Sequence, residues 1–421
     1  MSASSHSAGG SRVPPVAGST RLSTFHALQH RNFRLLWTGL AVSAVGTWMA
    51  IVAQSLLVLD LTHGSAVALG SVSLAQAVAF LVFAPIGGGV ADRFDRRRLL
   101  FVTQTLMMLF TTMLGVLTAT HTIRFWMIPV IAFAASATLS FDQPARNALA
   151  VSLVPKDALM NAVSLQSAIF NGASLLGPAL AGITLSRLGY PANFFLNAAS
   201  FLAVLVSLTL LDTSAVETSL TPKGGLLRSI REALRVIARD PILPYVISGY
   251  AALLFFGPSV ALMLPLFTRE ILHAGARDLG WLFSAVGAGT IFGALLVASI
   301  GDPPHKDRLA LGAMAVWTVL LASFCQTGSL WVGVGVLFLL GIAQNSAGAT
   351  TITLLQTRVP PEMRGRAMSL NTLLIMCLRP LGDFPAAALI GFVGFRTAVL
   401  VSASLVGSVL IVTLVFRRRR L

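Results

Sequence analysis

The amino-acid sequence predicts an all-α integral membrane protein with twelve transmembrane helices in two pseudo-symmetric six-helix halves. The first reason is composition. The 421 residues are 55% hydrophobic and have a mean hydropathy of +0.82, which leaves too few polar side chains to cover a water-soluble protein. The second is that apolar stretches of about 20 residues, the length that crosses a bilayer core, recur along the chain. The third is a repeat that relates its two halves.

The predicted spans follow one another with short polar connections. In chain order they occupy residues 34–59, 65–90, 99–119, 125–145, 160–187, 192–211, 243–269, 279–300, 309–326, 330–354, 367–392 and 397–416. Because their number is even, both chain ends are expected on the same side of the membrane.

Basic residues are distributed unevenly between the two predicted membrane faces. With the N-terminus inside, inner segments hold 24 of the 30 Lys and Arg residues, outer connections hold five, and Arg379 falls within a span. Because cytosolic loops are enriched in basic residues, we expect both termini in the cytosol and, in a bacterial host, a place in the inner membrane. The net charge of +15 then reports orientation and contact with membrane lipids, so we expect no nucleic-acid partner.

The repeat divides the chain near its middle. VPKDALMNAVSLQSAIFNGASLLGPALAG from residue 154 matches the segment from residue 359 at a constant offset of 205, with Val154, Pro155 and Gly177 among the positions that recur. Two such halves with substrate held between them are typical of transporters. The predicted divisions are a disordered N-terminus (1–30), an N-terminal half (31–211), a linker (212–242), a C-terminal half (243–416) and a basic tail (417–421). The linker sequence LLRSIREALRVIARD favours an amphipathic helix on the inner membrane surface over a solvated connection.

The most informative loop is GGGVADRFDRRRLL, residues 87–100, between the second and third spans. A metal site on Asp92 and Asp95 is excluded because four arginines flank the pair and their field opposes a divalent cation. The two cysteines form no metal or disulfide pattern. We therefore expect neither a metal nor a cofactor.

The same loop resembles the signature loop of the major facilitator superfamily. The resemblance rests on Gly88, Asp92, Arg93, Arg96 and Arg97 at the spacing Gly-x-x-x-Asp-Arg-x-x-Arg-Arg. It implies a charge relay at the cytosolic face that helps hold the two halves together in the outward-facing state. The chain departs from the family pattern at one position, because Asp95 stands where the family often has glycine, and this puts the turn in doubt.

The resemblance covers residues 25 to 416 and narrows in three places. GASLLGPALAG is similar to the exporter-type motif of the superfamily, with Gly177, Pro178 and Gly182 in place, although such glycines also serve ordinary helix packing. FDQPARNALAVSLVP from 141 and NFFLNAASFLAVL from 193 look like the branch that includes enterobactin exporters and macrolide efflux pumps. The resemblance implies proton-coupled export.

Ionisable residues within spans are the candidates for coupling. Arg379 lies twelve residues into its span, about 18 Å deep at a rise of about 1.5 Å per residue, and Asp383 is one helical turn further, between two prolines. Either Asp383 takes up a proton while Arg379 tunes it or binds an anionic substrate, or the two form a static neutralising pair. Asp142 and Arg146, also four apart, are expected in a cytosolic charge network.

Polar and aromatic residues at mid-span are candidates for a substrate cavity, although each alone is more often explained by helix packing than by ligand contact. They are Trp48, Gln54, Gln166, Asn171, Phe255, Phe256, Gln344 and Asn345. With 25 Phe and 3 Tyr in the chain, the cavity is expected to be largely apolar.

The sequence thus predicts a monomeric transporter, and no enzyme, that exports a siderophore or drug-like compound by alternating access and proton antiport. Uptake or lipid handling by the same fold is one alternative, and a non-transporting membrane sensor or assembly partner is another. The signature loop argues against the last alternative, because a sensor has little need of a gate.

Overall fold

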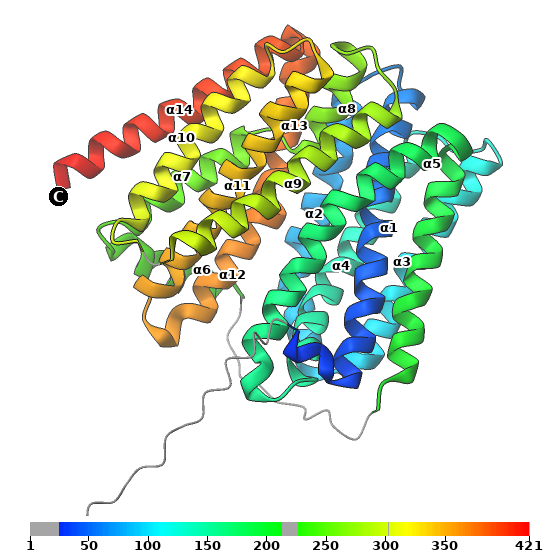
Figure 1. The fold of residues 1–421 in the computed structure, drawn as a ribbon, viewed down its shortest axis with the longest axis horizontal. Coiled ribbons are helices and arrows are strands. Elements are labelled where there is room, and N and C mark those ends of the chain that lie inside the picture. Colours follow the sequence, from blue (N-terminus) through cyan, green and yellow to red (C-terminus); the bar gives the residue numbers. More distant parts are fainter. Residues whose placement is uncertain (1–24, 213–225, 302, 421) are drawn as a thin grey trace, which may run out of the picture.

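The computed structural model describes residues 25–212, 226–301 and 303–420, apart from the side chains of Gly88, Asp92, Lys156, 226–230 and 417–420. Within these ranges the chain forms helices and no strands, so the predicted fold class is confirmed. Figure 1 shows the helices in two groups that lean against each other.

The N-terminal half holds five helices and two short 3₁₀ turns. They are η1 (His26–Gln29), α1 (Arg31–Leu61), α2 (Ala66–Arg93), α3 (Arg96–Ala119), α4 (Met127–Ser152), η2 (Lys156–Ala158) and α5 (Leu159–Leu210). Helix α5 contains two spans, because Gly189, with a φ of 74°, breaks it into two segments. The predicted disordered segment 1–30 lies mainly outside the described residues. Its end differs from the prediction, since η1 is held by an N–H···O bond of 2.8 Å from Ala27 to the Asn161 side chain.

The C-terminal half begins with a helix inside the predicted linker. Its elements are α6 (Leu226–Arg239), α7 (Leu243–Phe256), α8 (Val260–Glu270), α9 (Ala276–Ile300), α10 (Lys306–Phe324), α11 (Leu330–Arg358), η4 (Pro361–Met363), α12 (Arg364–Leu373), η5 (Leu374–Leu378), α13 (Arg379–Val393) and α14 (Phe395–Arg420). Ala233 and Ile237 of α6 are buried in the core of this half, and Glu232 forms an ion pair with Arg366 of α12. The proposed contact of α6 with the membrane surface stays a prediction.

The helices are consistent with twelve spans. In the described ranges nine helices, with η4 to α13 taken as one, are long and apolar enough to cross a membrane, and α7 with α8, bent by 41°, forms a tenth. The break in α5 separates two of the predicted spans. Helix α4 is less apolar because its last turns carry Asp142 and Arg146, yet it packs against α2 and α3.

In the described part of the chain, the core that the two halves share lies toward one end of the molecule. We call the end with the start of α1, η2 and η4 the terminal side, and the opposite end the distal side (Figure 1). The larger hydrophobic cluster joins residues of both halves, among them Leu69 of α2 and Ala387 of α13, whereas the smaller cluster holds residues of the N-terminal half near the terminal side, such as Phe33 and Leu149. Close packing therefore joins the halves on the distal side.

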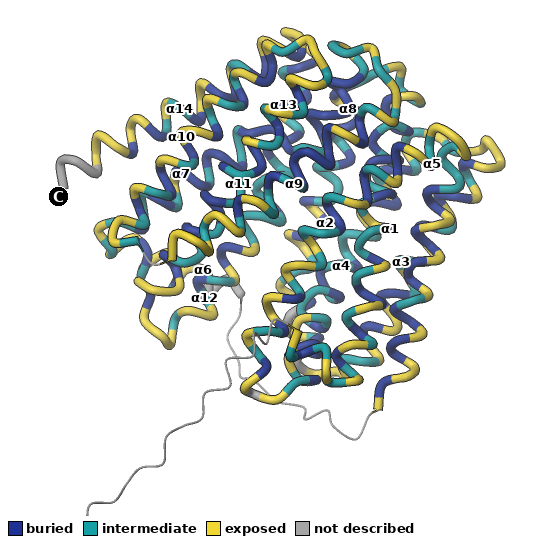
Figure 2. Tube along the Cα trace, viewed as in Figure 1, coloured by how far each residue is buried: buried dark blue, intermediate teal, exposed yellow. Residues whose placement is uncertain are grey.

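Direct contacts between the halves agree with this division. An added Cβ at Gly70 of α2 would lie 2.5 Å from Ala387, and one at Gly287 of α9 would lie 2.6 Å from the Ser174 carbonyl oxygen of α5. Further toward the terminal side, the apolar side chains of these helices become exposed, as at Val82 (52%) and Phe170 (60%). The structure is therefore closed on the distal side (Figure 2).

Candidate coupling site and gates

Asp383 sits where three helices from both halves meet. Its side chain is 2% exposed. One carboxylate oxygen accepts the backbone N–H of Ser259 at 2.8 Å, in the break between α7 and α8. The hydroxyl groups of Ser259 and of Ser73, on α2 in the other half, lie close enough to interact with this carboxylate. A single buried acid thus contacts α7–α8 and reaches across to the N-terminal half.

The local sequence explains why this site is irregular. The chain breaks after Gly257-Pro258, and Ser259 then caps α8 by accepting the N–H of Leu262 at 3.2 Å. Opposite it, the π-helical turn η5 ends at Leu378, next to Pro380, which has no N–H to continue the helical ladder. The helix is therefore irregular just before Arg379.

Arg379 lies on the same face as Asp383 but is not bound to it. Arg379 is half-buried, and its nearest electrostatic partners are Tyr250 of α7 and the Asp383 carboxylate. Among the described residues, no ion pair within 4.0 Å links Arg379 to an acid. The guanidinium is therefore available to other anions, while the carboxylate is held by backbone and hydroxyl groups.

The signature loop is bound within its own half. The Asp95 side chain caps α3 by accepting the N–H of Arg98 at 2.7 Å, which gives this departure from the family pattern a structural role. Arg97 donates to the carbonyl groups of Leu208 and Thr209 at the end of α5, at 2.6 and 3.1 Å. Arg93 is exposed and Arg96 half-buried.

The remaining residues of this loop leave its predicted role open. The surroundings of Gly88 and the side chain of Asp92 lie outside what the structure describes. A relay between the halves would need the terminal side closed, so it stays a prediction.

Asp142 and Arg146 form an ion pair near the terminal side. The Asp142 carboxylate is fully buried and accepts the Thr103 hydroxyl at 2.8 Å and the Gln104 amide at 2.7 Å. Its further partners therefore lie on α3 rather than among the described side chains of the signature loop. The network ties α4 to α3.

The exporter-type motif lies at two helix contacts. A Cβ at Gly177 would be 2.5 Å from the Trp48 Cβ of α1, and one at Gly182 would be 2.8 Å from the Ala276 carbonyl oxygen of α9. The Pro178 carbonyl oxygen lies 2.7 Å from the position of a Cβ at Gly280. The motif therefore packs α5 against its own half and against the other half at once.

This packing predicts opposite effects of two glycine substitutions in α5. Gly177→Ala should lower the stability of the purified protein by about 1–3 kcal/mol, because α1 must move to admit the methyl group. Gly172→Ala, where nothing lies within 4 Å, should leave stability unchanged or raise it by up to about 1 kcal/mol. Thermal unfolding in detergent compares the two, and equal effects would contradict the packing role.

A second inter-half contact lies at the distal surface. Arg269, at the end of α8, pairs with Asp60 at the end of α1 at 2.9 Å, and the Tyr190 hydroxyl donates to the same carboxylate. We name these three residues the distal latch. The latch joins the halves on the side where they are already packed.

Replacement of Asp60 by Asn should change stability by less than about 1 kcal/mol, because the Arg269 and Asp60 side chains are 39% and 54% exposed. Thermal unfolding at low and high salt measures this, and the difference between wild type and variant should shrink as salt screens the pair. A loss of several kcal/mol at any salt concentration would show that the latch is not a surface pair.

The cavity candidates are all half-buried, and none of them lines the cavity between α5 and α9 that is described below. The Trp48 ring meets Phe170 of α5 edge-on at 5.7 Å, and Phe255 meets Phe256 at 5.1 Å. The Asn345 side-chain nitrogen is buried without a hydrogen-bond partner. Gln54, Gln166, Asn171 and Gln344 have no further described role, so all eight stay predictions.

Ser73, Ser259 and Tyr250, which surround Arg379 and Asp383, were not predicted from the sequence. The one signal for them in the sequence is the helix-breaking Gly257-Pro258 before Ser259. The described residues contain no group of three or more His, Cys, Asp or Glu side chains placed to hold a metal ion.

Comparison with known proteins agrees with this architecture. The family model of transmembrane secretion effectors matches residues 22–421. The chain is 27% identical to the MFS-type transporter YfiS of Bacillus subtilis, over 92% of this chain and 94% of that protein. It is 27% identical to the enterobactin exporter EntS of Citrobacter koseri (91% and 90%) and 21% identical to macrolide efflux protein A of Streptococcus pyogenes (90% and 95%). An inward-facing bacterial homologue of the iron transporter ferroportin has a similar fold, with a TM-score of 0.71 at 17% identity over 92% of this chain and 98% of that one.

Proposed function

Because the chain belongs to the transmembrane secretion effector family of major facilitator transporters, we propose that it exports a siderophore or drug-like compound by alternating access and proton antiport. It is a multi-pass membrane transporter of small molecules and not an enzyme. The names of its efflux-type relatives support export over uptake. We further propose a monomer in a bacterial inner membrane with both termini in the cytosol. The terminal side is then cytosolic, and the structure corresponds to an inward-facing state.

The observation that carries the proposal is the position of Asp383 between the halves. An ionised carboxylate is a strong acceptor for the Ser259 N–H and for the Ser73 hydroxyl of the opposite half. A protonated carboxyl is a weaker acceptor, so proton binding loosens the contact that closes the outer side. The charge of Asp383 thus shifts the equilibrium between the inward-facing and the outward-facing state.

This bias makes the closing of the outer side depend on the protonation of Asp383, as coupling to protons requires. With neither proton nor substrate bound, the ionised Asp383 favours the inward-facing state. Substrate taken from the cytosol must supply the free energy that opens the outer side. After substrate leaves, a proton from outside neutralises Asp383, and the protonated carrier returns to the inward-facing state and releases the proton to the cytosol.

The residues near the site favour an amphipathic cargo. Trp48 and Phe170 offer an aromatic surface, and Phe170 is 60% exposed. Arg379 is half-buried and free of an ion pair with a described residue, so it can bind a carboxylate or catecholate group of the cargo. An anionic siderophore meets both requirements, and a macrolide meets the first.

Accumulation in cells tests the function. Cells that lack their own efflux pumps, with and without this protein, are loaded with siderophores, macrolides and dyes. We expect lower accumulation of at least one compound in cells that carry the protein, and a protonophore should remove the difference. Equal accumulation of the whole panel, with the protein shown to be in the membrane, would count against export of these classes.

A further inference from the structure

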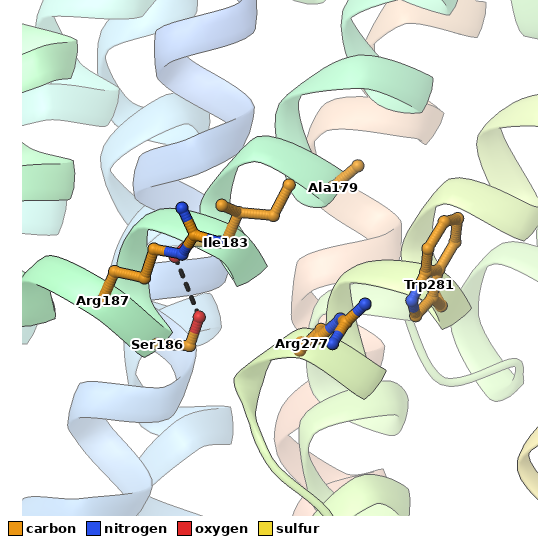
Figure 3. A pocket seen from close by; sticks show the side chains of 6 residues that line it. All are labelled: Ala179, Ile183, Ser186, Arg187, Arg277 and Trp281. Carbon is orange, nitrogen blue, oxygen red and sulfur yellow. Dashed lines mark hydrogen bonds between the residues drawn. The ribbon is translucent and has the colours of Figure 1, made fainter.

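A cavity of about 230 Å³ lies between the two halves on the distal side, away from the coupling site. Figure 3 shows its lining on two neighbouring helices. Helix α5 contributes Ala179, Ile183, Ser186 and Arg187, and α9 contributes Arg277 and Trp281. Its volume is several times the roughly 30 Å³ of one liquid water, so it has room for a phosphodiester group.

The two arginines that line this cavity favour the binding of an anion. Arg187 and Arg277 form no ion pair with any acid in the described part of the chain, unlike Arg269, which pairs with Asp60. Two of the five basic residues expected in the outer connections thus face one space without a counter-charge. Guanidinium groups bind phosphate oxygens with paired, charge-assisted hydrogen bonds. The Ser186 hydroxyl donates to the Ile183 carbonyl at 2.9 Å, so recognition rests on the arginines (Figure 3).

We propose that this cavity binds the phosphate of an anionic phospholipid. The apolar part of the lining selects a lipid over a free anion, because Ile183 and Trp281 are 47% and 46% exposed beside the arginines. An acyl chain covers such apolar surface, whereas a dissolved phosphate leaves it in contact with water. Tryptophan is also enriched at the depth of lipid headgroups, where its amphipathic ring faces both lipid and water.

A lipid bound here joins the two halves. Gly182 holds α5 against Ala276 and Arg277, so the cavity lies directly on the inter-half contact. A phosphate held by Arg187 of one half and Arg277 of the other stabilises the closed distal side. This consequence rests on the proposed alternating access, whereas the binding itself does not.

Native mass spectrometry of the purified protein, titrated with phosphatidylglycerol and separately with phosphatidylethanolamine, tests the site. Arg187→Gln with Arg277→Gln should weaken phosphatidylglycerol binding roughly tenfold or more, since each basic residue near a lipid surface contributes about fivefold. Arg124→Gln, an exposed arginine outside the cavity, is the matched control and should bind like wild type. Equal binding by all three proteins overturns the proposal.

Two further measurements test whether the bound anion is a lipid or free phosphate, and whether its binding brings the two halves together. Millimolar inorganic phosphate should leave phosphatidylglycerol binding unchanged, and displacement by phosphate would assign the site to a soluble anion and overturn the lipid. Cross-linking between cysteines placed on the distal ends of α5 and α9 should rise with phosphatidylglycerol in wild type but not in the double variant. If phosphatidylglycerol binds but cross-linking does not increase, the lipid site stands and the bridging role is contradicted. This outcome does not depend on any transport assay.

Discussion

Asp383→Asn should abolish proton-driven export while leaving the protein folded in the membrane. The amide oxygen of Asn still accepts the Ser259 N–H, so the fold should lose no more than about 1 kcal/mol. The side chain no longer changes charge, however, and resembles the permanently protonated acid. Substrate accumulation driven by a pH gradient in proteoliposomes should therefore fall to the level of vesicles without protein.

The same variant should keep exchange that needs no proton. With substrate on both sides and no pH gradient, Asp383→Asn should still exchange labelled for unlabelled substrate, because its halves can still alternate. Asp157→Asn, an exposed acid on the terminal side, is the matched control and should transport like wild type. Gradient-driven accumulation by Asp383→Asn would show that the coupling proton binds elsewhere.

The second large effect is expected on stability, at Asp142. Asp142→Ala removes the buried acceptor of Thr103, Gln104 and Arg146, and should lower the free energy of unfolding by about 3–5 kcal/mol. The loss arises because the amide of Gln104 and part of the guanidinium stay buried without a partner. Thermal unfolding of the purified protein measures the effect.

Two variants make this result specific. Asp157→Ala removes an exposed acid on the same side and should change stability little. Asp142→Asn keeps the shape of the side chain and one acceptor. It should therefore lower the free energy of unfolding less than Asp142→Ala does. An unfolding temperature of Asp142→Ala equal to that of wild type would mean that the network does not hold α3 and α4 together.

The sequence predicted what depends on short-range pattern. Apolar length predicted the spans, and helical spacing predicted the Asp142–Arg146 pair. The apolar pattern is weakest at α4, because charged residues lower its mean hydropathy although the helix still packs in the bundle. The loop resemblance identified the family, because its residues are close in the chain.

Contacts between helices that are far apart in the chain could not be predicted from short-range patterns. The spacing of Arg379 and Asp383 suggested a pair, but the carboxylate is held by Ser259 and Ser73, which are 124 and 310 positions away in the chain. Nothing in one sequence specifies which helix break faces which acid. The cavity at Arg187 and Arg277 depends likewise on how α5 packs against α9.

The pH gradient of energised inside-out vesicles tests the central claim most directly. In these vesicles export carries substrate inward, so an antiporter must release luminal protons when substrate is added. We expect a siderophore or macrolide to lower the gradient in vesicles that contain this protein, and to have no effect with Asp383→Asn or in empty vesicles. Substrate uptake by wild type with the gradient unchanged would contradict proton antiport.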